Sequence, residues 1–113
     1  MAKTMDVAAM EAKAGEVAVL FRALANERRL MILCKLVQWG EANVGTLADA
    51  VGLSQSALSQ HLAKMRDEGI VTFRRESQTL WYRIADPRIE QMFAMLHRIF
   101  CEPDERTTRR PKG

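Results

Sequence analysis

The sequence predicts a small, mainly α-helical domain that carries a single β-hairpin, in the order helix, helix, helix, helix, strand, strand, helix. Three observations lead to this fold class. Apolar residues recur at three- and four-residue steps over most of the chain, which is the period of a helix. Gly52 separates a short helical segment from a longer one. The period then changes to that of strands over residues 70–84.

The size and charge of the chain limit the classes of protein to which it can belong. With 113 residues, 48% of them hydrophobic, the length predicts one domain over residues 1–101, followed by a polar, disordered tail over 102–113. The net charge of +3 permits an anionic partner without requiring one. We expect no signal peptide and no membrane span, and therefore a reducing, cytoplasmic compartment.

The first two helices are expected over residues 5–24 and 27–39. In the first helix, the apolar positions share one face: Val7, Met10, Ala14, Val17, Leu20, Phe21 and Leu24. Asn26 is a favourable N-cap for the second helix, and Gly40 stops it. The inward stripe of the second helix is expected to contain Leu30, Leu33, Cys34 and Val37.

The middle of the chain predicts two helices joined by a tight turn. Residues 43–45 are expected to break the chain before a short helix over 46–51. Gly52 supplies the turn, and Ser54 is a favourable N-cap for a longer helix over 55–68.

The end of the chain predicts a hairpin and a last helix. Two short strands are expected over 70–74 and 80–84, with the polar segment 75–79 as the turn between them. Asp86 precedes a proline, which suits the first position of a helix, so the last helix is expected over 87–101.

The helix over 55–68 separates into two faces on a helical wheel. Leu58, Leu62 and Met65 fall together and must face the core. The opposite front is neutral and carries side chains that suit base edges in the DNA major groove: Gln55, Ser56, Ser59 and Gln60. A short helix, a glycine turn and such a helix form the helix-turn-helix plan. The alternative interpretation is an ordinary amphipathic helix with a polar outer face.

The predicted hairpin adds polar and basic side chains beside this helix. Arg74 and Arg75 precede or begin the turn and Gln78 lies within it, where a two-stranded wing can place them along a DNA backbone or minor groove. Lys64, farther along the helix over 55–68 (the recognition helix of this plan), suits a contact with a DNA phosphate. Together these features predict a winged helix-turn-helix that binds double-stranded DNA. A solvated hairpin tip is the alternative interpretation.

A resemblance adds to this prediction. The segments FRALANERRLMILCKL and VGTLADAVGLSQSALSQHLAKMRDEGIVTFRRESQTLWYRI resemble the ArsR/SmtB family of winged-helix repressors, over about residues 16–101. The resemblance implies a homodimer built from the first and last helices. It implies that this dimer binds an imperfect inverted repeat in an operator until an inducer lowers its affinity. It also implies His61 and Lys64 as DNA backbone contacts beside the four base readers.

Metal sites known in this family are missing from the sequence. At the start of the third helix, where one class carries Cys-x-Cys, this chain has NVGTLAD. Asp86 is followed by Pro87 and Arg88, so the Asp-x-His of another class is absent, and His97 stands alone. No metal and no cofactor is therefore expected.

Two cysteines lie outside the DNA-reading segment. Cys34 is in the middle of the second helix and Cys101 is at the end of the last helix. Taken alone, they are either small buried hydrophobes or reactive thiols. Their positions, in LMILCKL and RIFCEP, resemble those of the persulfide-responsive BigR/SqrR subgroup, and the architecture is also similar to HlyU-type regulators. The resemblance implies a redox switch with reactive sulfur species as inducer, with a sensor of metalloids, metals or general oxidants as the runner-up.

Two other classes of function compete with a repressor. A winged-helix module for protein interaction would use the apolar faces of the first and last helices, but the Gln/Ser front of the recognition helix favours DNA. An enzyme is not expected, because the sequence has no C-x-x-C motif, no paired carboxylates and no Ser/His/Asp set.

Overall fold

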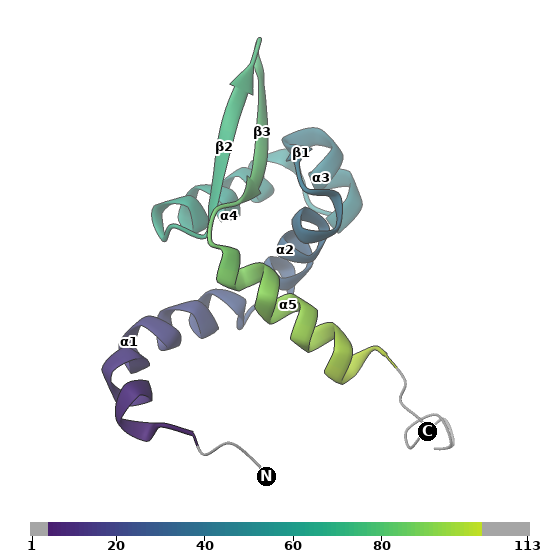
Figure 1. Ribbon diagram of the computed structural model, residues 1–113. Coiled ribbons are helices and arrows are strands. Elements are labelled where there is room, and N and C mark those ends of the chain that lie inside the picture. The colour runs from purple at the N-terminus through teal and green to yellow at the C-terminus, as the bar shows by residue number, and fades with distance from the viewer. Residues whose placement is uncertain (1–4, 103–113) are drawn as a thin grey trace.

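The computed structural model describes residues 5–102 and contains five helices and a small antiparallel sheet (Figure 1). The predicted element order is confirmed, with one short strand added before the third helix. The elements are α1 (Val7–Leu24), α2 (Glu27–Trp39), β1 (Ala42–Asn43), α3 (Val44–Val51), α4 (Gln55–Asp67), β2 (Val71–Glu76), β3 (Thr79–Ile84) and α5 (Pro87–Phe100). Apart from Glu102, the predicted tail lies outside the described residues, so its predicted disorder stays a prediction.

Each helix begins at a side chain that accepts a hydrogen bond from the backbone of its first turn. The predicted caps Asn26, Ser54 and Asp86 accept from backbone N–H groups at 3.1, 3.0 and 3.0 Å. Asp6 and Asn43 do the same, at 3.1 and 2.8 Å. A side-chain cap satisfies a donor that the helix itself cannot pair, so each of these residues fixes where its helix starts.

The third helix starts earlier than the sequence indicated. Residues 43–45 were expected to break the chain, but Asn43 is the N-cap of α3 and Gly45 lies inside its first turn. The expected start at residue 46 is therefore wrong, because an Asn suits the N-cap of a helix as well as a turn. The turn glycine is confirmed: Gly52 has a left-handed φ of 72°, which lets α4 start directly after α3.

The hairpin is longer and tighter than predicted. Its strands pair from Val71 opposite Ile84 to Glu76 opposite Thr79, so the turn contains only Ser77 and Gln78. Ser77 takes a left-handed φ of 56°, which a two-residue hairpin turn requires at its first position. β1 pairs with β3 on the other edge, giving the strand order β1-β3-β2. In Figure 1 the hairpin projects away from the helices as a wing.

The core lies where α2, α3, α4 and the base of the wing meet. The three predicted core residues of α4, Leu58, Leu62 and Met65, are all 0% exposed. The inward stripe predicted for α2 is only partly correct: Leu33 is fully buried, but it is accompanied by Ile32 and Leu36. Leu30 and Val37 are half-buried, and Cys34 is exposed. Because α2 contacts α1, α3, α5 and β3, its buried face is set by several neighbours at once.

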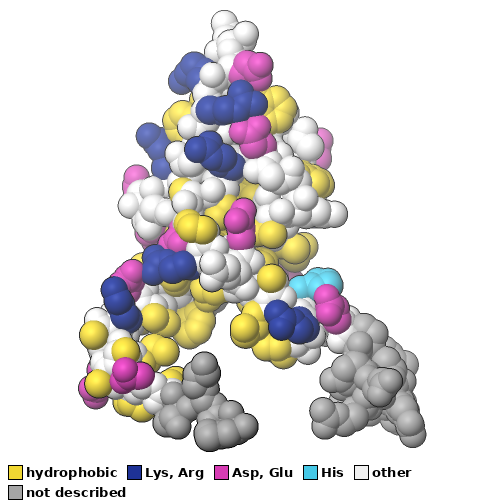
Figure 2. Space-filling model, in the orientation of Figure 1, with side chains coloured by type: hydrophobic (Ala, Val, Ile, Leu, Met, Phe, Trp, Pro, Cys, Tyr) yellow, Lys and Arg dark blue, Asp and Glu magenta, His cyan; other side chains and the backbone are white. Residues whose placement is uncertain are grey.

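The helices α1 and α5 extend away from this core on the side opposite the wing (Figure 1). Figure 2 shows hydrophobic side chains gathered along both projections, with Lys and Arg side chains on the wing above them. The large exposed hydrophobic side chains of the two helices include Val7, Met10, Val19, Phe21, Met95, Ile99 and Phe100. Within residues 5–102, neither of them nor any other helix is long and apolar enough to cross a membrane.

Candidate nucleic-acid interface

The outward face of α4 presents the four predicted base readers together. Gln55, Ser56, Ser59 and Gln60 are all exposed, at the N-terminal end of the helix. The Ser54 hydroxyl accepts from the Ala57 N–H at 3.0 Å, which fixes this end of the helix. Neutral side chains that both donate and accept hydrogen bonds, carried on a helix with small residues, can approach and read base edges.

The packing of α3 against α4 positions the first of these readers. A Cβ atom built on Gly45 would lie 3.5 Å from the Gln55 Nε2 atom, so Gln55 rests against the first turn of α3. The αL turn at Gly52 holds the two helices in this arrangement. The pair is therefore a helix-turn-helix in which the second helix exposes its polar front.

The predicted wing residues divide between the two faces of the hairpin. Side chains alternate along a strand, so Arg74 and Arg75 point to opposite sides. Phe73 shares its side with Arg75, and its ring lies 4.5 Å from the Arg66 guanidinium of α4. Arg75 therefore lies on the α4 side of the wing, and it is exposed, as is Gln78 at the tip. No acidic side chain among residues 5–102 pairs with Arg75.

Arg74 is held on the other side of the wing. Its Nε and Nη2 atoms donate to both carboxylate oxygens of Glu41 at 2.8 and 3.0 Å, and its Nη1 atom donates to Glu76 at 3.4 Å. Its guanidinium also lies 5.8 Å from the ring centroid of Trp81. The hydrogen bond from Arg74 lowers the pKa of the Glu41 carboxyl below its usual value. These contacts favour a bracing role between wing and core, and a DNA contact by Arg74 stays a prediction.

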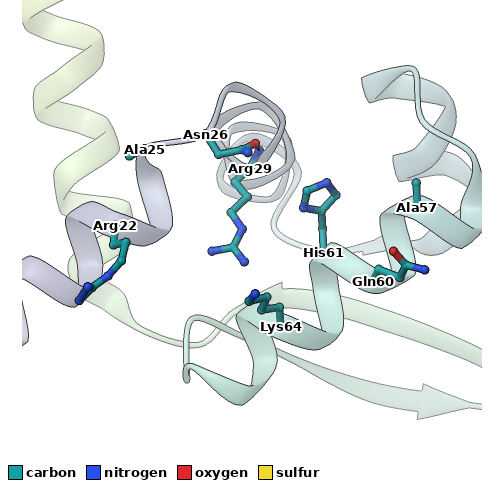
Figure 3. A pocket seen from close by; sticks show the side chains of 8 residues that line it. All are labelled: Arg22, Ala25, Asn26, Arg29, Ala57, Gln60, His61 and Lys64. Atoms are coloured by element: carbon teal, nitrogen blue, oxygen red, sulfur yellow. Dashed lines mark hydrogen bonds between the residues drawn. The ribbon is translucent and has the colours of Figure 1, made fainter.

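The remaining predicted contacts on α4, His61 and Lys64, line a groove of about 480 Å³ (Figure 3). The groove lies between α4 and the junction of α1 with α2, and it is lined by Arg22, Ala25, Asn26, Arg29, Ala57, Gln60, His61 and Lys64. The sequence alone does not indicate Arg22 and Arg29 as members of this site, since only the fold brings the α1–α2 junction beside α4. Burial lowers the pKa of the His61 imidazole, and the charges of Arg29 and Arg28 lower it further.

The two cysteines are free thiols and both are exposed. Cys34 lies on the outer face of α2, which excludes the interpretation of a small buried hydrophobe within this chain. Cys101 is the C-cap of α5, and its N–H donates to the His97 carbonyl at 2.8 Å. The His97 Nδ1 atom lies 3.4 Å from the Glu102 carboxylate. Among the described residues, no three His, Cys, Asp or Glu side chains cluster as metal ligands would.

Comparison with known proteins identifies the family. A family model described as "Bacterial regulatory protein, arsR family" matches residues 26–72. The chain is also 44% identical over 101 residues to the transcriptional activator HlyU of Vibrio cholerae, covering 89% of this chain and 93% of that relative. The chain belongs to the arsR family of bacterial regulatory proteins. The resemblance seen in the sequence is thereby confirmed.

Solved structures of other arsR-family proteins share the fold. HlyU from Vibrio cholerae superposes with a TM-score of 0.76 at 46% identity, over 82% of this chain and 100% of that one. The transcriptional repressor BigR from Xylella fastidiosa superposes with a TM-score of 0.81 at 39% identity, over 88% of this chain and 100% of that one.

A third solved structure is that of a homodimer from a possible arsR-family transcriptional regulator. The winged helix-turn-helix domain of Mb0332 from Mycobacterium bovis, determined as a homodimer, has a TM-score of 0.70 at 37% identity, over 88% of this chain and 89% of that one. The winged helix-turn-helix fold class is therefore confirmed. The relatives are transcriptional regulators rather than enzymes, and this arsR-family chain is a DNA-binding transcriptional regulator.

Proposed function

We propose that this arsR-family protein is a homodimeric cytoplasmic repressor that reactive sulfur species release from its operator through Cys34 and Cys101. The observation that carries the proposal is the placement of two free, exposed thiols. One lies on α2, which packs against the helix-turn-helix, and the other ends α5, which extends away from it. A covalent bridge between these helices would link the redox state to the position of α4.

The dimer forms through α1 and α5. A compact chain of this length has a radius of gyration of about 13 Å, whereas this chain has 16.8 Å because its two terminal helices project. Their exposed apolar side chains, such as Phe21, Ile99 and Phe100 at 58, 63 and 78% exposed, are covered when two copies meet. Arg88 supports the pair, since its Nη1 atom donates to Glu16 of α1 at 2.6 Å and its Nη2 atom donates to Asp86 at 2.7 Å.

A two-fold dimer presents two copies of α4 to an inverted repeat in double-stranded operator DNA. Gln55, Ser56, Ser59 and Gln60 contact base edges, and His61 and Lys64 contact the backbone. Arg75 and Gln78 of the wing contact the backbone or minor groove, while Arg74 holds the wing through Glu41. Two recognition helices fit successive major grooves only when they lie about 34–36 Å apart, so a bridge that alters this spacing lowers the affinity for DNA.

The switch chemistry needs only a persulfide donor. One cysteine thiolate attacks the outer sulfur of R–S–S–H, forming Cys–S–S–H and releasing the donor thiolate. The second cysteine thiolate then attacks the inner sulfur of that persulfide, forming the Cys34–Cys101 disulfide and releasing hydrosulfide. The two thiols are oxidised, and the donor sulfur is reduced to sulfide. A plain disulfide needs Cα atoms within about 7 Å, and a longer sulfur chain relaxes that limit.

The test follows DNA release by wild-type, Cys34→Ser and Cys101→Ser protein. Reduced wild-type protein should bind DNA from upstream of its own gene and lose that binding after treatment with a persulfide donor. Both serine variants should bind and stay bound. Mass spectrometry of the treated wild-type protein then identifies a disulfide or a longer bridge, and non-reducing electrophoresis shows whether it joins one protomer or two. Release of Cys34→Ser protein by the donor would contradict the thiol switch.

Treatment of the DNA-bound protein with arsenite distinguishes the persulfide switch from the alternative function, a metalloid sensor. If arsenite releases the wild-type protein and the persulfide donor does not, the same two thiols serve a metalloid sensor instead.

A further inference from the structure

We propose that the groove between the α1–α2 junction and α4 binds a phosphate group of the DNA backbone, through Arg22, Arg29 and Lys64 (Figure 3). The groove would therefore make the end of α1 and the start of α2 part of the DNA interface. The inference rests on the proposed binding of DNA, but it is independent of the thiol switch.

The charges of the groove match a phosphate. Its lining contains three Lys or Arg side chains, one His and no carboxylate. Among residues 5–102, no acidic side chain pairs with Arg22 or Lys64. The Arg29 Nη1 atom lies 3.4 Å from the carboxylate of Glu68, which is not one of the lining residues. Cations gathered at one concave site repel one another unless an anion enters, and Arg side chains suit the geometry of phosphate oxygens.

The position of the groove matches the second backbone of a major groove. Arg66 contacts Phe73 of the wing, so one flank of α4 faces the hairpin. Ala57, His61 and Lys64 lie on the other flank, where they line the groove. A recognition helix in a major groove about 12 Å wide has a phosphate backbone on each side. The wing reaches one of them, and the groove reaches the other.

His61 reports occupancy of this groove. It is half-buried and lines the groove together with Arg22 of α1, Arg29 of α2 and Lys64 of its own helix. The charges of Arg29 and Arg28 act on its ring, and Arg29 also pairs with Glu68. Burial first, then the charges of Arg29 and Arg28, lower the pKa of the free imidazole. A phosphate in the groove favours the charged form, so DNA binding raises that pKa and takes up a proton. Affinity for DNA therefore rises as the pH falls through the pKa of the bound form.

The first test measures the salt dependence of binding to a random-sequence DNA duplex, because backbone contacts persist without an operator. In the reduced protein, Arg22→Gln should make the slope of log K against log salt less steep by about 0.9 for each protomer of the dimer, and so should Lys64→Gln. Arg98→Gln removes the same charge from α5, outside the groove, and should leave the slope unchanged. Arg22→Lys keeps the charge and should keep the slope.

The second test follows the His61 ring protons by NMR. The random-sequence duplex should raise the pKa of His61 in wild-type protein and should not do so in Arg22→Gln. Inorganic phosphate at constant ionic strength should have a much smaller effect than the duplex. If inorganic phosphate saturates the shift and the duplex leaves His61 unmoved, the groove holds a small free anion and the backbone assignment is wrong.

The outcomes separate this inference from the proposed repressor function. An unchanged salt slope for Arg22→Gln, in a protein that binds duplex DNA and responds to the persulfide donor, overturns the groove alone. A wild-type protein that binds no duplex DNA overturns both. A wild-type protein that binds DNA and ignores the donor overturns only the thiol switch.

Discussion

The helix-turn-helix and the two projecting helices differ in how completely one chain buries them. On α4, Leu58, Leu62 and Met65 are 0% exposed, packed within the same chain. On α5, Ile99 and Phe100 are 63 and 78% exposed although they are as apolar. The helix-turn-helix therefore buries its apolar side chains within one chain, whereas α1 and α5 leave apolar side chains exposed, as the dimer proposed above requires. Mutations in the two regions should therefore act on different equilibria.

The largest expected effect is on the buried core face of α4. Leu62→Ala removes a side chain that is 0% exposed, so it should lower the free energy of unfolding by about 2–5 kcal/mol. Urea unfolding monitored by circular dichroism measures this change. The loss should be the same at all protein concentrations at which the dimer is saturated. A loss below about 1 kcal/mol would show that α4 is less firmly packed than its burial indicates.

The next largest effect is expected on the exposed apolar side chains of α5. Phe100→Ser removes an exposed aromatic side chain that the proposed dimer would cover, and it should weaken dimerisation by about 1.5–3 kcal/mol for each protomer. Sedimentation over a range of concentrations measures the dissociation constant. Glu90→Ser changes an exposed polar residue of the same helix and serves as the control. If Phe100→Ser leaves dimerisation unchanged, the interface lies elsewhere.

A smaller effect is expected at the cap of α3. Asn43→Ala removes the acceptor of the Thr46 N–H, which lies at 2.8 Å, and should cost about 1 kcal/mol of unfolding free energy. Asn43→Asp keeps an acceptor and should retain most of the stability. Equal losses for the two variants would mean that the cap bond contributes little.

The smallest effects appear on acidification, and they divide between the two regions. The pKa of His61 is lowered by burial, so the unfolded chain binds its proton first and stability falls as the pH drops through about 6.5. The pKa of Asp86, between β3 and α5, is lowered chiefly by the hydrogen bond from Arg88. Its contribution is present above the ordinary Asp pKa and is lost as the pH falls below it.

Thermal unfolding scans of two variants at a series of pH values assign each loss of stability to its residue. His61→Gln should remove the dependence near neutral pH alone, and Asp86→Asn should remove part of the acid dependence alone. If either variant removes both steps, the two regions are coupled more closely than the structure indicates.

The sequence was sufficient for features that depend on local pattern. The core face of α4 follows from the spacing of Leu58, Leu62 and Met65, and the αL turn follows from Gly52. The hairpin follows from the change of period, although its turn is shorter than predicted because Glu76 and Thr79 pair across it. Polar residues near a turn do not reveal how far the strand ladder extends.

Features that depend on distant neighbours were not predictable. The prediction of the buried face of α2 was wrong in part because the run LMILC offers several apolar faces. Only the packing of α1, α3, α5 and β3 against α2 buries Ile32 rather than Cys34. The hydrogen bonds that hold Arg74 are made to Glu41, which lies 33 residues away in sequence. The cationic groove likewise joins Arg22 to Lys64 across three helices. Such sites need the fold before their members can be listed together.

The two-residue strand β1 has a mechanical consequence. Ala42 and Asn43 pair with Tyr82 and Trp81 of β3, and Asn43 is also the cap on which α3 starts. β3 continues through only Ala85 and Asp86 into α5. A rotation of α5 therefore applies torque to β3, and β1 passes it to α3 without an intervening flexible linker. We expect the wing and the helix-turn-helix to turn as one rigid body, so that a small rotation at Asp86 is magnified at the wing tip.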